Sequence, residues 1–509
     1  MRRALLIFLG LAFITYLEFR YFPGHSYLQG DSQIFVPMLE KLDAPGFLSR
    51  DPVAVSPHLT YTIYDEATLF FHRLTKQSFE TVLLAQLLLS RAAALLGIFL
   101  LVLSTGLNAG YALFLSSLIN VGAVLPGVNE LLIGREPVPH VLAFGFTLLA
   151  LGSLADEKPL LAGLAGGIAL AYHFPTAAPF WFVVIAMLFD RKLRRLARPM
   201  LPILVVFTLL LANLAQLQPG VVEPQDFFNR ISEQWARLQY EQTPSVWVST
   251  WAAKFIWLYL AIFTLGAYAA SRIWPSLNRQ SRWLLIVLTS CGLLSVPLSA
   301  FLLGYLRWSL ISQLQPARAL LFTVGLASAV FGIAGAQALQ KRKGLEACFW
   351  LFIVVAMPLS FVAFRPREKS AEPVVSMEEV AAWAEANTWG SSMFLFPDAG
   401  RALYPGVFRA RSVRAVYVDW NSRQLIKYFE KFAFEWDQRW RKTMDGTYSA
   451  ERLRNFQTLP IDYYVLQSQH QLAGAVPVFA NKNFAVYDAQ DLKKLNLIST
   501  TSPLSSGKK

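Results

Sequence analysis

The feature that most constrains this chain is the recurrence of apolar windows long enough to cross a lipid bilayer. A helix of about twenty apolar residues spans the hydrocarbon core. Hydrophobic residues make up 55% of the 509-residue sequence, and charged residues only 16%. The sequence therefore predicts a mainly α-helical, polytopic transmembrane domain. We count about eleven spans, at roughly 3–20, 79–103, 108–126, 138–154, 159–175, 176–190, 199–217, 251–271, 283–304, 317–338 and 345–363.

Basic residues in the short loops predict the orientation of these spans, because Lys and Arg are enriched in cytoplasmic loops. Counting from Arg2 and Arg3 places the three most basic short loops on the side of the N-terminus; they are 190–198, 271–282 and 340–346. We expect a multi-pass membrane protein with a cytoplasmic N-terminus, and a family resemblance given below implies that the membrane is a bacterial cell (inner) membrane. Loops 20–78 and 218–250 and the C-terminal region are then external or periplasmic. Loop charge explains much of the net +13, so we expect no nucleic-acid partner.

A change of composition after residue 364 predicts a second domain. A charged linker leads into SMEEVAAWAEANT, in which Ser376 and Glu379 have the spacing of a helix N-cap and capping box. We expect residues 1–364 to form the transmembrane domain, 365–495 a small soluble α/β domain, and 496–509 a disordered tail. A helix is expected around 421–442, and short strands are expected at 392–396, 413–419, 462–467, 477–481 and 483–488.

Loop 20–78 is the longest polar interruption in the first 200 residues, and it carries the candidate catalytic acid. Loops of this length in a compact protein are usually functional or disordered, and this one is rich in aromatic and apolar residues. Asp31 lies about ten residues beyond the first span. One carboxylate can remove the proton from an acceptor hydroxyl during displacement at an activated anomeric carbon. The alternative is that Asp31 caps a helix beginning in SQIFVPMLEKL.

Three further acidic residues of this loop have either a structural or a functional interpretation. Asp51 precedes a proline and is typical of a turn. Asp65 and Glu66 form the only adjacent acidic pair of the loop, and they either bind a divalent cation or begin a solvated helix. They are the candidates for a metal site, and a divalent cation is the one possible cofactor.

Several predicted external cations are candidates for binding the phosphate of a substrate, because Arg binds phosphate in a bidentate manner. The alternative is that they anchor the chain among lipid headgroups. Arg91 differs from the others, because it falls near the middle of a span, where an ionisable residue is functional or paired. The candidates near the outer interface are Arg135, His140, His173, Arg307 and Arg318. Loop 218–250 is rich in Trp and Tyr and either anchors at the interface or forms a gate.

Motifs that are missing from the sequence narrow the choice of activity. It contains no GxxxxGK[ST], and no GxGxxG after a strand. The two cysteines, Cys291 and Cys348, lie in apolar segments and indicate neither a disulfide framework nor a metal cluster. An activated substrate would therefore arrive in the membrane or from outside.

The chain resembles the GT-C superfamily of integral membrane glycosyltransferases, and in particular a bacterial group with an external C-terminal domain. Asp31 matches the acid that these proteins carry soon after the first span. The other segments that carry the resemblance are GREPVPH (134–140), AYHFPT (171–176) and the run EEVAAWAEANT…MFLFPD…FRARSVRAVYVDW. The resemblance implies a polyprenyl-phosphate-linked sugar donor and a lipid, glycan or protein acceptor.

Two departures from the family pattern matter. Asp31 is followed by Ser32 rather than by a second acid, and no WWDYG-type motif is present. Our leading hypothesis is a glycosyltransferase with Asp31 as general base and with substrate bound by Arg135, His140, His173, Arg318 and Arg91. The alternatives are a transporter or flippase of a lipid-linked or amphipathic substrate, and a non-catalytic envelope assembly protein with a degenerate GT-C fold.

Overall fold

The computed structural model describes residues 2–56, 62–217, 229–364, 372–446, 448–456 and 458–494. The chain forms two compact units, and each consists of two separate stretches of sequence. The first unit comprises Met1–Tyr27 and Pro57–Pro366. The second comprises Leu28–Ser56 and Arg367–Lys509.

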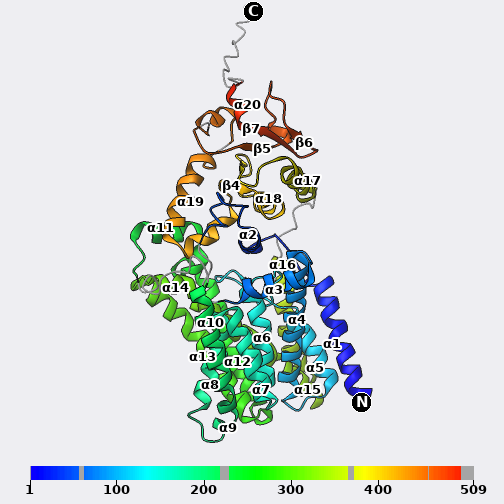
Figure 1. Cartoon of the computed structure of the whole chain (residues 1–509). Helices are drawn as coiled ribbons and strands as arrows, with labels where there is room; N and C mark the ends of the chain where they lie inside the picture. Colours follow the sequence, from blue (N-terminus) through cyan, green and yellow to red (C-terminus); the bar gives the residue numbers. More distant parts are fainter. Residues whose placement is uncertain are drawn as a thin grey trace, which may run out of the picture. The chain divides into compact units, whose positions relative to one another are not determined.

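The first unit is a helical bundle with one small β-hairpin (Figure 1). The hairpin pairs β1 (Val124–Leu125) with β2 (Glu130–Leu131) in antiparallel register. The helices are α1 (Arg2–Arg20), α3 (Tyr64–Thr75), α4 (Phe79–Leu103), α5 (Ala109–Asn120), α6 (Pro139–Ala155), α7 (Pro159–Tyr172), α8 (Phe174–Met187), α9 (Arg194–Ala197), α10 (Leu201–Leu217), α11 (Glu233–Gln242), α12 (Ala253–Ile273), α13 (Arg279–Ser299), α14 (Ser309–Leu314), α15 (Leu320–Gln340) and α16 (Gly344–Phe364).

Each predicted span coincides with a helix of this bundle. Among the described residues, five helical stretches are long and apolar enough to cross a membrane, and further apolar helices are shorter. The chain is thus a multi-pass membrane protein by helix length and composition, while the count of about eleven spans stays a prediction. The five stretches are Phe79–Leu103, Arg194–Leu214, Ala253–Ser276, Arg279–Tyr305 and Ser309–Gln340.

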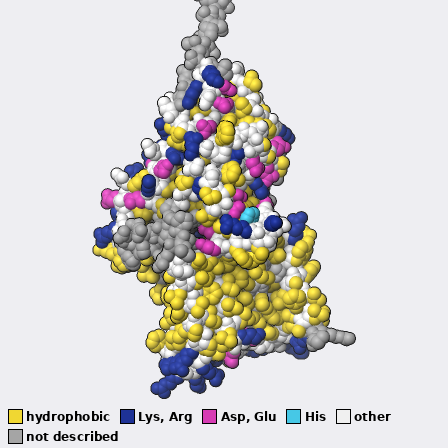
Figure 2. Space-filling model, in the orientation of Figure 1, with side chains coloured by type: hydrophobic (Ala, Val, Ile, Leu, Met, Phe, Trp, Pro, Cys, Tyr) yellow, Lys and Arg dark blue, Asp and Glu magenta, His cyan; other side chains and the backbone are white. Residues whose placement is uncertain are grey.

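The three most basic short loops lie at the same end of the first unit. Asp190 accepts hydrogen bonds from Arg279, with a closest distance of 2.6 Å, and so joins the first of these loops to the start of α13. Arg272 pairs with Glu346 at 3.0 Å, which joins α12 to the start of α16. Figure 2 shows a broad apolar surface over these helices and a group of Lys and Arg side chains at the end that bears α9. This arrangement agrees with the side that loop charge predicts for these segments.

Close packing of α4 against α6 depends on glycine. A Cβ on Gly152 would lie 2.0 Å from the carbonyl oxygen of Gly97, and a Cβ on Gly145 would lie 2.2 Å from that of Ser90. Small residues at such points let two helix backbones approach closely. This packing favours helix association inside a lipid bilayer, where the hydrophobic effect is absent. Ser90 adds a 2.9 Å hydrogen bond to the carbonyl of Leu142 on α6.

The second unit is built on a five-stranded sheet in the order β4-β3-β5-β7-β6. Strands β4 (Ala415–Val416), β3 (Met393–Leu395) and β5 (Tyr463–Gln467) run parallel, and β7 (Phe484–Asp488) and β6 (Phe479–Ala480) complete the sheet in antiparallel register. These strands fall within the five predicted ranges. The helices of this unit are α2 (Ser32–Asp43), α17 (Glu372–Asn387), α18 (Tyr404–Ser412), α19 (Glu430–Thr443) and α20 (Ala489–Lys494).

The stretch Leu28–Ser56 packs with the C-terminal sheet, although we expected all of residues 1–364 in one domain. Gln33 on α2 donates to the carbonyl of Leu403 at 3.0 Å. Arg50 forms an ion pair with Asp462 at 2.8 Å. Such pairings between distant parts of the chain are not visible in local hydropathy, and they place the candidate acid Asp31 in the second unit.

Ser376 is not the N-cap that the capping-box spacing predicted. Helix α17 begins at Glu372, so Ser376 lies within it. Its hydroxyl instead accepts a 2.8 Å hydrogen bond from Asn483, and Glu379 accepts one from Asn481. The predicted pair therefore joins α17 to the turn between β6 and β7.

Candidate functional site

The carboxyl ends of the three parallel strands carry most of the polar side chains that we assign to the site. Asp398 and Arg401 follow β3, Trp420 and Arg423 follow β4, and His470 follows β5. In open α/β sheets, ligands bind outside this edge. The side chain of Asp398 is buried and accepts a 2.8 Å hydrogen bond from the His470 imidazole, and its burial raises the pKa of the carboxyl despite that contact.

Asp31 joins this edge from the other stretch of the second unit. It is half-buried and directly precedes α2. Asn421, which follows β4, donates a 2.6 Å hydrogen bond to the carbonyl of Gly30, the residue before Asp31. The Asp31 side chain makes no capping hydrogen bond to α2. The Asp31 side chain therefore does not serve the capping role that was its alternative, and its role as a base stays a prediction.

Two arginines lie over one tryptophan beside this acid. The Cζ atoms of Arg423 and Arg401 lie 4.0 and 4.5 Å from the centroid of the Trp420 ring. Burial lowers the pKa of Arg423; the charge of Asp31 opposes this shift and the charge of Arg401 adds to it. Arg423 is therefore close enough to the Asp31 carboxylate and to the Arg401 guanidinium to interact electrostatically with each of them.

A buried ion-pair network holds this part of the unit together. The Arg409 guanidinium on α18 is fully buried and donates to Asp51 at 2.8 Å and to Asp419 at 2.5 Å. Burial alone would lower the pKa of Arg409, but the two carboxylates raise it above its ordinary value, so the charge is kept. Asp51 also accepts hydrogen bonds from the backbone of Val53, Ala54 and Val416. It shapes the turn that its Asp-Pro sequence predicted and also fixes the first loop to β4.

Three of the predicted substrate-binding cations gather in the first unit around Glu130, on β2. Arg318 pairs with Glu130 at 2.5 Å, and His140 lies 3.5 Å from the same carboxylate. The rings of His140 and His173 are 6.0 Å apart. His173 is the residue between α7 and α8, and it caps α8 through Thr176. Glu130 offsets part of the positive charge, and sequence reasoning did not identify it.

The other two residues of the predicted substrate-binding set, Arg91 and Arg135, lie near α1. Arg91 donates to the carbonyls of Glu18 and Gly134, at 3.3 and 2.9 Å, and interacts electrostatically with the Glu18 carboxylate. Glu18 is thus the charge partner of the mid-span arginine, which the sequence did not name. Arg135 lies close enough to Arg91 for their charges to interact, and its carbonyl accepts from the backbone of Ser26.

Asp65 and Glu66 lie in the first turn of α3, so the predicted helix start is confirmed, although the solvation predicted with it is not found at Asp65. Asp65 is buried. In the part of the chain that the structure describes, no three His, Cys, Asp or Glu side chains gather closely enough to hold a metal ion. A cation bound at Asp65 and Glu66 would therefore need ligands from substrate or water, and the metal site stays a prediction.

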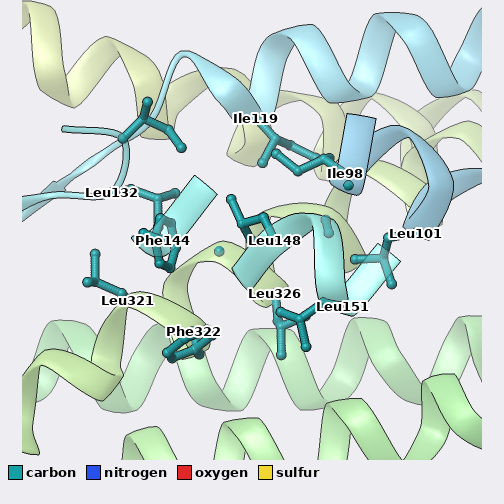
Figure 3. Close-up of a pocket in the computed structure, with 14 residues that line it drawn as sticks. Ile98, Leu101, Ile119, Leu132, Phe144, Leu148, Leu151, Leu321, Phe322 and Leu326 are labelled. Atoms are coloured by element: carbon teal, nitrogen blue, oxygen red, sulfur yellow. The ribbon is translucent and has the colours of Figure 1, made fainter. Parts of the chain in front are cut away.

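A pocket of the first unit is purely apolar and includes none of the predicted site residues. Figure 3 shows its lining side chains, which come mainly from α4, α6 and α15. Its labelled lining residues are Ile98, Leu101, Ile119, Leu132, Phe144, Leu148, Leu151, Leu321, Phe322 and Leu326. A second pocket is lined in part by Arg318, Gln315 and Ser245.

Sequence reasoning missed Arg401, Trp420 and Arg423. The only available signal was their position directly after predicted strands, which matters only once the strands are known to be parallel. Asp31 is 370 positions before Arg401 in the sequence, so its proximity to these residues had no local signature.

Comparison with known proteins gives distant structural likeness only. No family model matches the chain, and no curated protein matches its sequence. An oligosaccharyltransferase of Archaeoglobus fulgidus shares 13% identity and a TM-score of 0.46, over 91% of this chain and 69% of that one. ArnT from Cupriavidus metallidurans shares 11% identity and a TM-score of 0.48, over 96% and 97% of the two chains.

The arabinofuranosyltransferase AftD from Mycobacteria shares 15% identity and a TM-score of 0.49, over 96% of this chain but only 40% of that one. Two of these three proteins are sugar transferases by name. Likenesses this distant carry no argument about activity or substrate, so a functional assignment has to rest on the residues of this chain.

Proposed function

We propose that this protein is a membrane glycosyltransferase that moves a sugar from a polyprenyl-phosphate donor to a lipid, glycan or protein acceptor on the outer side of a bacterial cell membrane. The observation that carries the proposal is the environment of Asp31. This acid is half-buried, makes no capping hydrogen bond, and lies at the carboxyl edge of a parallel sheet, where its charge interacts with that of Arg423.

Asp31 would act as the general base. As the acceptor oxygen attacks the anomeric carbon, Asp31 would take the proton of the acceptor hydroxyl, and the bond from that carbon to the phosphate oxygen would break. The leaving phosphate needs no proton, only fixed positive charge. One carboxylate and a few cations are therefore enough for the reaction.

The cations of the first unit remain the proposed contacts for the donor. Arg318 and His140 are already paired with Glu130, so a phosphate would share them with that carboxylate. Arg91 donates to main-chain carbonyls, which favours a role in holding helices together. The apolar surface of the bundle suits a lipid-linked substrate that arrives within the membrane.

The test is transfer by the purified full chain in lipid vesicles. Polyprenyl-phosphate sugars with a labelled sugar would be offered one at a time, together with an extract of envelope lipids and glycans. We expect label from at least one donor to move to an acceptor, and boiled protein to give none. If no donor is consumed, and labelled lipid crosses the vesicle bilayer instead, the transport alternative replaces this proposal.

A further inference from the structure

The pair Arg401 and Arg423 is an unusual arrangement for a protein surface. Two guanidinium groups lie within 4.5 Å of one Trp420 ring, although like charges at close range repel. Cation–π attraction to Trp420 offsets part of that repulsion. Within the described part of the chain, neither arginine forms an ion pair within 4 Å, so positive charge is left over.

Arg423 and the Trp420 ring are held in place before any ligand arrives. Arg423 is half-buried and donates to the carbonyl of Trp420 at 3.0 Å. The Trp420 ring packs against Trp440, with ring centroids 5.2 Å apart. The preceding residue, Asp419, is fixed by Arg409 and by the backbone of Ser422. Groups fixed in this way lose little entropy when they bind a ligand.

The nearby acids do not neutralise the pair. Asp419 is already committed to Arg409. Asp31 attracts Arg423 electrostatically but does not form an ion pair with it within the described residues. An exposed Arg401 and a half-buried Arg423 therefore present donors to solvent at the edge where Asp31 lies.

We propose that Arg401 and Arg423, supported by Trp420, form a binding site for an anionic oxygen group, phosphate or carboxylate, of the substrate that Asp31 acts on. Guanidinium groups suit both anions, because they donate two parallel hydrogen bonds. This inference rests on the proposed function and deepens it. The second unit would bind an anionic group of the substrate as well as supply the base. The anion is either the donor phosphate or an acidic group of the acceptor.

The experiment measures binding to the full-length protein in detergent by titration calorimetry at low salt. Farnesyl phosphate serves as the probe for a lipid phosphate, and glucuronic acid as the probe for an acidic sugar. We expect one of them to bind, and Arg401→Gln and Arg423→Gln each to weaken it by about tenfold or more, since charge-assisted hydrogen bonds are lost. Asp31→Asn should tighten binding, because a repelling charge is removed.

Arg441→Gln is the matched control, because Arg441 is an exposed arginine of the same unit, paired with Asp437; it should leave binding unchanged. If Arg401→Gln and Arg423→Gln weaken the binding of farnesyl phosphate, the anion is the donor phosphate. If they weaken the binding of glucuronic acid, the anion is an acidic group of the acceptor. If neither probe binds, or if Arg401→Gln and Arg423→Gln bind as well as the Arg441→Gln control, the proposal is overturned. Arginine-dependent binding without any sugar transfer would keep the anion site and reject the transferase.

Discussion

At the scale of single residues, Arg409 is the side chain on which the second unit most depends. Its guanidinium is fully buried between Asp51 and Asp419, so it fixes the stretch Leu28–Ser56 to the C-terminal sheet. A buried ion pair adds little net stability compared with an apolar replacement, but breaking one leaves an uncompensated charge. Arg409 therefore attaches the segment that carries Asp31 to the C-terminal sheet through specific ion pairs.

We expect Arg409→Gln to lower the free energy of unfolding of the second unit by about 3–5 kcal/mol, because two carboxylates are left buried without their cation. Urea unfolding of the purified chain measures this, and trypsin cleavage at Arg50 reports whether the first stretch detaches. Arg411→Gln is the control, because Arg411 makes a partly exposed pair with Glu378. If Arg409→Gln lowers the free energy of unfolding no more than Arg411→Gln does, Arg409 does not hold this segment in place.

Glu40 on α2 provides a test by pH. Burial, followed by repulsion from Asp43 and Glu385, raises the pKa of its carboxyl to about 7. The folded state therefore holds this proton more tightly than the unfolded state, whose ordinary value is 4.5. The stability that this group contributes is present below pH 4.5 and is lost as the pH rises towards about 7.

Glu40→Gln should consequently raise the stability at pH 8 by on the order of 1 kcal/mol and change little at pH 4. Thermal unfolding at the two pH values measures the difference. The exposed Glu451→Gln should show no such pH-dependent gain. An equal effect of Glu40→Gln at both pH values would argue against a buried, repelled carboxylate.

At the scale of elements, the contact of α4 with α6 sets the spacing of the bundle. Gly97 and Gly152 lie backbone to backbone, and even a methyl group at Gly152 would overlap a carbonyl oxygen. We expect Gly152→Ala to destabilise the first unit by about 1–3 kcal/mol, as overpacking does. Thermal unfolding in detergent is the measurement. Gly344→Ala is the control, since a Cβ there meets nothing within 4 Å, and equal effects of the two would contradict the packing account.

Helices of the bundle could be predicted from the sequence because their signal is local. Runs such as 79–103 and 159–175 are apolar throughout, and α4 and α7 follow them closely. The interactions that place site residues are not local. Ser376 has the spacing of a cap but binds Asn483, more than 100 positions away. Glu130 likewise pairs with Arg318, which is distant from it in the sequence.

At the scale of the whole molecule, the chain is divided in a way that its hydropathy does not reveal. The polar loop after α1 contains Asp31, whose role as the catalytic acid stays a prediction. Its stretch Leu28–Ser56 belongs to the second unit, because Gln33, Arg50 and Asp51 bind residues beyond position 400. We expected a soluble α/β domain at 365–495, and the compact unit that contains this range also includes Leu28–Ser56.

The predicted orientation can be tested by labelling single cysteines in a background without Cys291 and Cys348. Arg195→Cys and Lys343→Cys, in two of the basic loops, should react together with a membrane-impermeant maleimide only from the cytoplasmic side. Gln77→Cys, at the opposite end of α4 from the loop before α5, should react only from the outside. If Arg195→Cys and Lys343→Cys label from opposite sides, the arrangement of the helices is wrong.

The central claim is that Asp31 is the base of a sugar transfer, and the most direct test is the activity of Asp31→Asn in the vesicle assay. Losing a general base typically costs about 10²–10⁴-fold in rate. We predict a loss of this size, with unchanged unfolding, while Asp43→Asn at the other end of α2 keeps wild-type activity. If Asp31→Asn transfers sugar as fast as the unaltered protein does, Asp31 is not the base.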